Sequence, residues 1–193
     1  MFRKTPVKNM KQIKNLKKLI FSDFYRYFGR FPNFFDIFYY GVLGRHPCFQ
    51  INLFLRLNSR LNNIFLKYIY NRIQLRRGLS IPPSIEIGYG LYIAHGFSII
   101  INPTTKIGDK VNISHFLTIG SNHGQAALIK NQVYIGPNVT ILENVIIENN
   151  TTIGAGSVVT KSILENSTVC GVPAKNISMK TPGRFIKNQY EAT

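Results

Sequence analysis

Histidine is the side chain that most readily exchanges a proton near neutral pH. Three of the four histidines in the chain are candidates for chemistry: His95, His115 and His123. A neutral imidazole can remove the proton of an attacking hydroxyl group, which makes it the usual general base. The two cysteines, Cys48 and Cys170, form no CxxC or Cys/His spacing, so neither a structural zinc site nor a disulfide scaffold is indicated. These residue types therefore favour acid–base chemistry by histidine.

The segment that must position these histidines carries a six-residue repeat. From Ile81 onward an aliphatic residue recurs at every sixth position, and the register breaks only twice, by two residues after Ile99 and by ten after Ile119. Neither a helix period of 3.6 nor a strand period of 2 explains this spacing. The twelve phased positions are Ile81, Ile87, Ile93, Ile99, Ile107, Ile113, Ile119, Ile135, Ile141, Ile147, Ile153 and Val159.

The repeat predicts a triangular coil of short strands, in which each strand contributes one inward aliphatic residue and about 18 residues make one turn. The two breaks predict loops, the second of them over residues 120–132. Glycine directly follows several phased aliphatics, at corners where a Cβ atom would be crowded, and a second inward position is expected four residues after each phased one. The corner glycines are Gly88, Gly108, Gly136 and Gly154, and the second inward set includes Val111, Leu117, Val139, Val145 and Ser157.

Several phrases in this repeat resemble the hexapeptide-repeat acyltransferases. They are Ile-Gly at residues 87–88, 107–108 and 135–136, the run Ile-Gly-Ala-Gly-Ser-Val-Val-Thr-Lys at 153–161, and Gly-Val-Pro-Ala-Lys at 171–175. The resemblance implies a left-handed parallel β-helix over residues 80–177, a homotrimer, and acetyl-CoA bound without a metal in clefts between subunits. Residues 1–79 are expected to form a basic, aromatic-rich helical region, and residues 178–193 a C-terminal tail.

Within that superfamily, residues 81–103 are most similar to serine acetyltransferases and their relatives in polysaccharide gene sets. The chain has Ser-Ile-Pro-Pro at 80–83 where those enzymes have Asp-Ile-His-Pro, Ala94-His95 where they have Asp-His, and Ala126 in place of their second histidine. The carboxylates that would hold free serine are therefore missing. This comparison favours a sugar hydroxyl acceptor in surface polysaccharide biosynthesis, with serine or an amino-sugar nitrogen as the alternative acceptors.

The resemblance makes His95 the general base of a transfer without a covalent enzyme intermediate. His115 follows Ile113 as His95 follows Ile93, so we expect the two rings on neighbouring coils, about 4.8 Å apart. There His115 would keep His95 neutral or position the acceptor. His123, in the loop after Ile119, resembles the base of galactoside and maltose acetyltransferases and is the rival. Each histidine has an ordinary surface role as its alternative.

The resemblance also implies the groups around the base. Ser80 and Glu86 are candidates to orient it. Coil corners present N–H groups outward, so backbone amides near two glycines are expected to bind the oxyanion and the pantetheine arm, with two lysines as phosphate counterions. The predicted cofactor residues are Gly120, Gly136, Ala155, Gly156, Ser157, Lys161 and Lys175, and the predicted acceptor residues are Ser80, Ala94 and Asn122.

The positive charge of the chain is concentrated before the repeat. Of its net +16, most comes from the first 80 residues, where Asp23 and Asp36 are the only acids. Residues 7–27 and 49–73 show helical spacing of apolar side chains and predict two amphipathic helices. These helices either pack against the rest of the protein or lie on an anionic membrane surface. Aromatic residues between Tyr25 and Tyr40 favour the membrane interpretation.

The sequence predicts no membrane-spanning helix and no secretory signal. The longest aromatic and aliphatic stretch, residues 34–43, is about half the length that a span requires, and the basic N-terminus lacks a following apolar core. The expected location is the cytoplasm, with peripheral contact at the inner face of the cell membrane.

Two other function classes remain as alternatives. A γ-class carbonic anhydrase shares the β-helix and binds zinc through three histidines, but the separations of 20 and 8 residues between His95, His115 and His123 do not resemble that family. A nucleic-acid-binding or scaffold protein would use the basic, aromatic N-terminal region, although no known RNA-binding phrase supports it.

Overall fold

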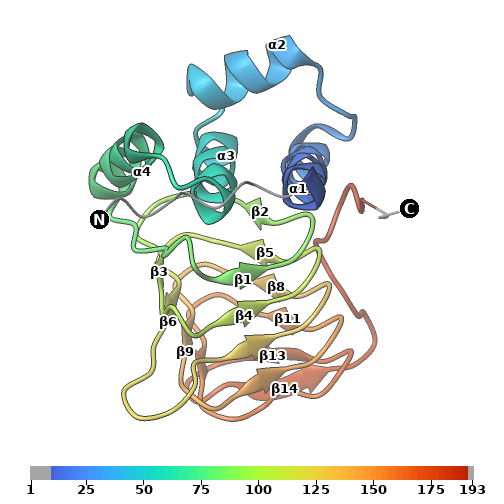
Figure 1. Ribbon diagram of the computed structural model, residues 1–193. Helices are drawn as coiled ribbons and strands as arrows, with labels where there is room; N and C mark the ends of the chain where they lie inside the picture. The colour runs from blue at the N-terminus through green and yellow to red at the C-terminus, as the bar shows by residue number, and fades with distance from the viewer. Residues whose placement is uncertain (1–9, 191–193) are drawn as a thin grey trace.

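A helical layer covers one end of a triangular β-helix (Figure 1). The computed structural model describes residues 10–190, and side chains from residue 15. The helices are α1 (Met10–Phe28), the short α2 (Phe34–Asp36), the π-helix η1 (Ile37–Val42), α3 (Pro47–Arg60) and α4 (Ile64–Arg77). The chain enters the first coil directly after α4, because Gly78 adopts the left-handed conformation (φ 62°) that ends a helix.

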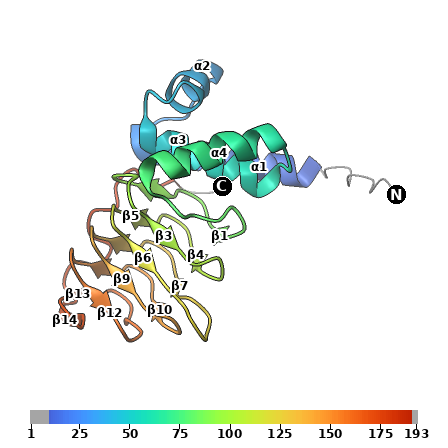
Figure 2. The ribbon, with the colours of Figure 1, turned by 90° about the vertical axis from the view of Figure 1, so that its left-hand side faces the viewer.

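The β-helix has three sheets, which Figure 2 shows from the side. They have the strand orders β1-β4-β7-β10, β2-β5-β8-β11-β13-β14 and β3-β6-β9-β12, and only the β13–β14 pair is antiparallel. The structure confirms the prediction of a left-handed parallel β-helix with a helical N-terminal region. The strands are β1 (Glu86–Ile87), β2 (Tyr92–Ile93), β3 (Ile100–Ile101), β4 (Lys106–Ile107), β5 (Asn112–Ile113), β6 (Thr118–Ile119), β7 (Leu128–Ile129), β8 (Tyr134–Ile135), β9 (Thr140–Ile141), β10 (Ile146–Ile147), β11 (Thr152–Ile153), β12 (Val158–Val159), β13 (Thr168–Cys170) and β14 (Lys175–Ser178).

The inside of the coil is filled by the two inward positions that the repeat predicts. All of the predicted phased aliphatics are buried except Ile87, which is half-buried. The second inward set is buried as well, including Val111, Leu117 and Val139. Each buried Ile or Val side chain contributes about 1.5–3 kcal/mol relative to exposure, so the stacked columns hold the coils in register.

The first break in the repeat lies one corner earlier than the sequence suggests. Ile101 pairs with Ile119 and is the inward residue of its strand, whereas Ile99 occupies the second inward position. The two extra residues therefore fall between Ile93 and Ile101, in the corner that carries His95. The prediction was wrong here because both Ile99 and Ile101 are aliphatic and buried, so periodicity alone does not separate them.

The second break is shorter than predicted. Leu128 and Ile129 form β7, which pairs with β4 on one side and β10 on the other, and the Ile129 side chain is fully buried. The loop therefore ends before residue 128 rather than at Gln132. The phased isoleucine was missed because the loop has an irregular length, which hides the register of the strand that follows it.

The helical region differs from the prediction at its second helix. The first predicted helix corresponds to α1, and residues 7–9 lie outside the described part of the chain. The predicted helix over residues 49–73 is instead two helices, because Leu61 is extended and the Asn63 side chain accepts hydrogen bonds from the N–H groups of Phe65 and Leu66. An N-cap asparagine begins a new helix. The prediction was wrong because the helical spacing of apolar residues continues across this break.

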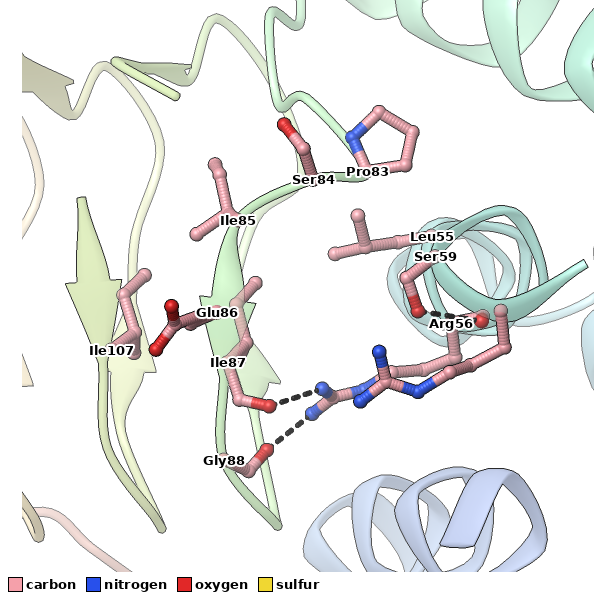
Figure 3. Close-up of a pocket in the computed structure, with 11 residues that line it drawn as sticks. Leu55, Arg56, Ser59, Pro83, Ser84, Ile85, Glu86, Ile87, Gly88 and Ile107 are labelled. Carbon is pink, nitrogen blue, oxygen red and sulfur yellow. Dashed lines mark hydrogen bonds between the residues drawn. The ribbon is translucent and has the colours of Figure 1, made fainter. Parts of the chain in front are cut away.

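The helices attach to the first coil through a buried ion pair. The Arg56 side chain donates to both carboxylate oxygens of Asp23, at 2.8 and 3.0 Å. It also donates to the carbonyl oxygens of Ile87 (2.8 Å) and Gly88 (2.6 Å), as Figure 3 shows. Asp23 in turn accepts from the N–H of Leu91. The pair therefore connects α1, α3 and the open end of the β-helix.

The C-terminal tail runs back along the β2–β5–β8–β11 face toward α1 (Figure 1). The Asn112 side chain donates to the carbonyl of Phe185, and the Arg26 Nε donates to that of Lys187. The Phe185 ring packs against the Tyr134 ring in a tilted arrangement, with centroids 4.9 Å apart. The tail thus closes over one face of the coil and contacts the helical layer.

We predict that Asp23→Ala lowers the free energy of unfolding by about 3–5 kcal/mol, because it leaves the buried Arg56 guanidinium without a countercharge. The matched control is Lys106→Met, which removes an exposed pair with Glu86 (3.4 Å) and is expected to cost less than about 1 kcal/mol. Urea denaturation measures both. Equal losses would contradict the role given to the buried pair.

Candidate functional site

His95 and His115 lie on the same corner of the triangular coil, in successive turns. His95 lies between β2 and β3, and His115 lies between β5 and β6. We call the column of corners from Ala94 down to Gly171 the histidine edge. The two rings meet edge to face with centroids 5.3 Å apart, which confirms that they occupy neighbouring coils. His95 is exposed and His115 is half-buried. A group that approaches the edge from solvent therefore reaches His95 first.

His115 has an unsatisfied polar atom. Its Nδ1 is buried and has no hydrogen-bond partner among the described residues. The next residue, Phe116, has φ 57°, a conformation that a bulky side chain rarely adopts, and its ring is nearly half exposed beside Phe97. Buried polar atoms usually find a partner, so a bound molecule or water is expected to complete this corner.

Cys48, on α3, holds the backbone on both sides of His95. Its thiol donates to the carbonyl of Ala94 and accepts from the N–H of Gly96, both at 3.4 Å. Burial raises the pKa of the thiol, which keeps the donating proton in place at neutral pH. Sequence reasoning missed this residue, because no spacing connects Cys48 to a histidine 47 residues later.

A cleft of about 320 Å³ opens next to the same corner. It is lined by Phe97 of the histidine edge and by Gln50, Ile73, Arg76 and Arg77 of the helices. Neither arginine forms an ion pair with a carboxylate in the part of the chain that the structure describes. The cleft therefore offers positive charge to a molecule that reaches His95.

Part of the predicted cofactor set continues down the histidine edge. Ala155 and Gly156 are exposed there, two coils beyond His115, and the Gly156 N–H donates to the Pro137 carbonyl in the coil between. Lys175 is exposed on β14, where its backbone pairs with Cys170 at the end of this column.

Two other predicted cofactor residues have their polar groups occupied within the coil. Ser157 points inward, and its hydroxyl donates to the carbonyl of Gly154. The Gly136 N–H donates to Ile153, so it is not a free donor.

His123 lies on a different corner, which we call the loop edge and which contains residues 120–126, 142–144 and 161. The Glu143 carboxylate accepts from the backbone N–H groups of Asn122, His123 and Gly124 and from the Ser121 hydroxyl. These donors lower the pKa of Glu143 to about 2. Glu143 is thus the residue that shapes the loop, and sequence reasoning missed it because the contacts span about 20 residues.

The remaining predicted site residues are divided between the edges and the coil end. The Gly120 N–H donates to Ile141, and Lys161 is exposed on the loop edge. Ser80 caps the β3–β6–β9–β12 sheet, where its N–H donates to Ile99. Glu86, on β1, lines the pocket between α3 and the first coil that Figure 3 shows. Its carboxylate pairs with Lys106, so it does not orient His95. Ala94 is half-buried and its N–H donates to Ile113.

No metal-binding group is formed by the described residues, because no three His, Cys, Asp or Glu side chains gather in residues 15–190. His95 and His115 also form no ion pair with a carboxylate within that part of the chain. The histidine edge accordingly presents two imidazoles, exposed aromatic rings and neighbouring guanidinium groups.

This combination of a hexapeptide coil and a corner histidine defines a class of transferases, and comparison with known proteins agrees. The family described as bacterial transferase hexapeptide (six repeats) matches residues 126–161. The serine acetyltransferase of Helicobacter pylori J99 is 34% identical over 145 residues, which cover 71% of this chain and 85% of that protein. The chain therefore belongs to the family of hexapeptide-repeat transferases that includes the serine acetyltransferases.

Other relatives are longer than the matched region. The serine acetyltransferase of Staphylococcus xylosus is 34% identical over 65% of this chain, but the match spans only 61% of that protein. Among solved structures, Neisseria gonorrhoeae serine acetyltransferase in complex with serine superimposes with a TM-score of 0.72 and 28% identity, over 88% of this chain and 72% of the other. The similarity thus includes the helical region as well as the coil.

We predict that Glu143→Ala makes the amides of Asn122, His123 and Gly124 exchange hydrogen faster, because their shared acceptor is lost. Since the pKa of Glu143 falls from its usual 4.5 to about 2, its stabilising effect is full above pH 4.5 and is lost as the pH falls through about 2. Hydrogen-exchange mass spectrometry at neutral pH measures the change, with Glu165→Ala as the control. Unchanged exchange would contradict the assignment.

Proposed function

We propose that the chain transfers the acetyl group of acetyl-CoA to a hydroxyl group of a small acceptor, with His95 as the general base. The observation that carries the proposal is the pair of imidazoles on the histidine edge, one exposed and one with an unsatisfied buried nitrogen, in a chain of this family. Acetyl transfer to an alcohol needs a base and no covalent enzyme intermediate.

In the proposed reaction His95 removes the acceptor's hydroxyl proton as the oxygen attacks the thioester carbonyl. The tetrahedral intermediate then collapses, the C–S bond breaks, and the departing thiolate takes the proton from the imidazolium. His115, whose ring centroid lies 5.3 Å from that of His95, orients the acceptor. Products are CoA and the acetylated acceptor.

We further propose that the active unit is a homotrimer. The predicted site residues are divided between two corners of the triangle, with His95, Ala155 and Gly156 on one and His123 and Asn122 on another. A threefold arrangement sets the histidine edge of one copy against the loop edge of the next. One cleft would then contain both halves of the predicted site.

L-Serine is the acceptor that the comparisons favour. The relatives that align over most of the chain are named serine acetyltransferases, and the gonococcal structure that superimposes well contains serine. Expected products are CoA and O-acetylserine. This assignment replaces the sugar hydroxyl as the leading proposal.

A sugar hydroxyl remains the second candidate because of the charges at the site. The ammonium group of free serine requires a nearby acceptor when it is desolvated, and Ala94, directly before His95, offers no carboxylate. The adjacent cleft presents Arg76 and Arg77 instead. This surface suits an acceptor that carries a negative group, such as an acidic or phosphorylated sugar.

We predict that His95→Ala lowers turnover by about 10²–10⁴ while acetyl-CoA affinity stays within about twofold, because only proton transfer is lost. A thiol-release assay gives turnover, and calorimetry gives affinity. His46→Ala, which changes a histidine that caps α3, is the matched control. If His123→Ala abolishes turnover and His95→Ala does not, the base lies on the loop edge and the assignment is wrong.

We predict that L-serine is the acceptor. With acetyl-CoA present, L-serine is expected to accelerate CoA release, and mass spectrometry is expected to detect O-acetylserine. Release with acidic or phosphorylated sugars but not with serine would favour the second candidate. Failure of every hydroxyl acceptor, with acetyl-CoA bound, would contradict the proposed function.

A further inference from the structure

Seven large apolar side chains stand exposed on residues 31–43, the segment that contains α2 and η1. Phe34 and Phe35 are the most exposed, at 79% and 77%. In Figures 1 and 2 this segment lies on the side of the helical layer that faces away from the β-helix. We call it the aromatic ridge, and its residues are Phe31, Phe34, Phe35, Phe38, Tyr39, Val42 and Leu43.

The aromatic residues of the helical region divide into two groups. Phe24, Phe28 and Tyr40 pack together with Phe49, and ring centroids within this group lie 4.3–6.5 Å apart. Tyr27 is tied to the β-helix through its hydroxyl, which contacts both the N–H and the carbonyl of Ile93. Packing therefore accounts for the inner aromatics. On the ridge, Phe31 contacts Tyr25 and Tyr190, and Tyr39 contacts Tyr40. Phe34 and Phe35 have ring contacts only with each other among the described residues.

The ridge is held in a fixed conformation. Arg30 donates to both carboxylate oxygens of Asp36 at 2.7 Å, and Asn33 and Asp36 form a reciprocal capping box. Arg30 lowers the pKa of Asp36 to about 2. At Gly41 a Cβ atom would lie 2.4 Å from the Leu53 side chain, so η1 sits directly on α3. These contacts hold the aromatic side chains outward instead of allowing them to fold onto the helices.

The helical region that carries the ridge has a large excess of basic residues. Between residues 15 and 85 the acids are Asp23 and Asp36, and each is buried against an arginine. The exposed Arg30 pairs with Asp36, but five other exposed basic residues of this region form no ion pair with a carboxylate within the described chain. They are Arg45, two residues after the end of the ridge, and Arg60, Lys67, Arg72 and Arg76 on α3 and α4.

We propose that the aromatic ridge docks on an anionic lipid bilayer. Apolar side chains beside uncompensated cations are the two signals that peripheral membrane binding combines. Each basic group that reaches an anionic leaflet contributes appreciably, and Phe and Tyr insert at the headgroup level. Two copies of the chain would instead bring like charges together across the ridge. No helix within residues 10–190 is long and apolar enough to span the bilayer.

Vesicle sedimentation tests the proposal with point variants, because deletion of residues 1–45 would also remove Asp23. We expect the unchanged chain to bind vesicles of phosphatidylcholine with phosphatidylserine and to lose binding as salt rises. The ridge variant Phe34→Ser/Phe35→Ser is expected to bind at least about tenfold more weakly. The matched control is Leu164→Ser/Val172→Ser, which changes two exposed apolar side chains on the β-helix (both 72%) and should bind normally.

Three results would overturn the proposal. They are equal binding by the ridge variant, equal binding to vesicles of phosphatidylcholine alone, and a ridge variant whose mass by light scattering falls while vesicle binding is unchanged. The last result would assign the ridge to contacts between copies. Thermal unfolding midpoints check that each variant is folded, and none of these readouts depends on acetyl transfer.

Discussion

The open end of the β-helix is the constraint on which the structure depends. Every inner coil pairs its backbone with the coils on both sides, but the first coil has a neighbour on one side only, and buried unpaired backbone groups are costly. Helix side chains supply the missing partners: Arg56 for Ile87 and Gly88, Asp23 for Leu91, Asn52 for Leu91 and Tyr27 for Ile93. The charged helical region is thus part of the fold, not an appendage to it.

The same attachment shapes the histidine edge. The corner that carries His95 is two residues longer than the corner of His115, and Gly96 lies in the additional length. A Cβ atom there would lie 2.2 Å from the end of the Ile51 side chain, so a larger residue would have to displace Ile51 or the corner from α3. Cys48 then fixes the backbone on either side of His95. Helix packing, coil geometry and the position of the proposed base are therefore connected.

The sequence predicts what depends on local repetition. Ile93, Ile113 and Ile135 recur in phase, so the coil and the proximity of His95 to His115 follow from spacing. Prediction from the sequence fails where two residues fit the same position, or where a residue acts through contacts with residues far along the chain. Ile99 and Ile101 are both buried, the apolar spacing runs through the helix break at Asn63, and Cys48 and Glu143 act through contacts far along the chain. The aromatic segment was identified, but only packing separates its inner residues from the ridge.

A crystal structure of the assembled chain with CoA tests the central claim most directly, namely that acetyl transfer takes place on the histidine edge. The account predicts that the CoA thiol lies within hydrogen-bond reach of the site beside His95 and that the pantetheine arm runs along Ala155 and Gly156 toward Lys175. A thiol placed on the loop edge beside His123, with His95 of every copy remote from it, would contradict the account.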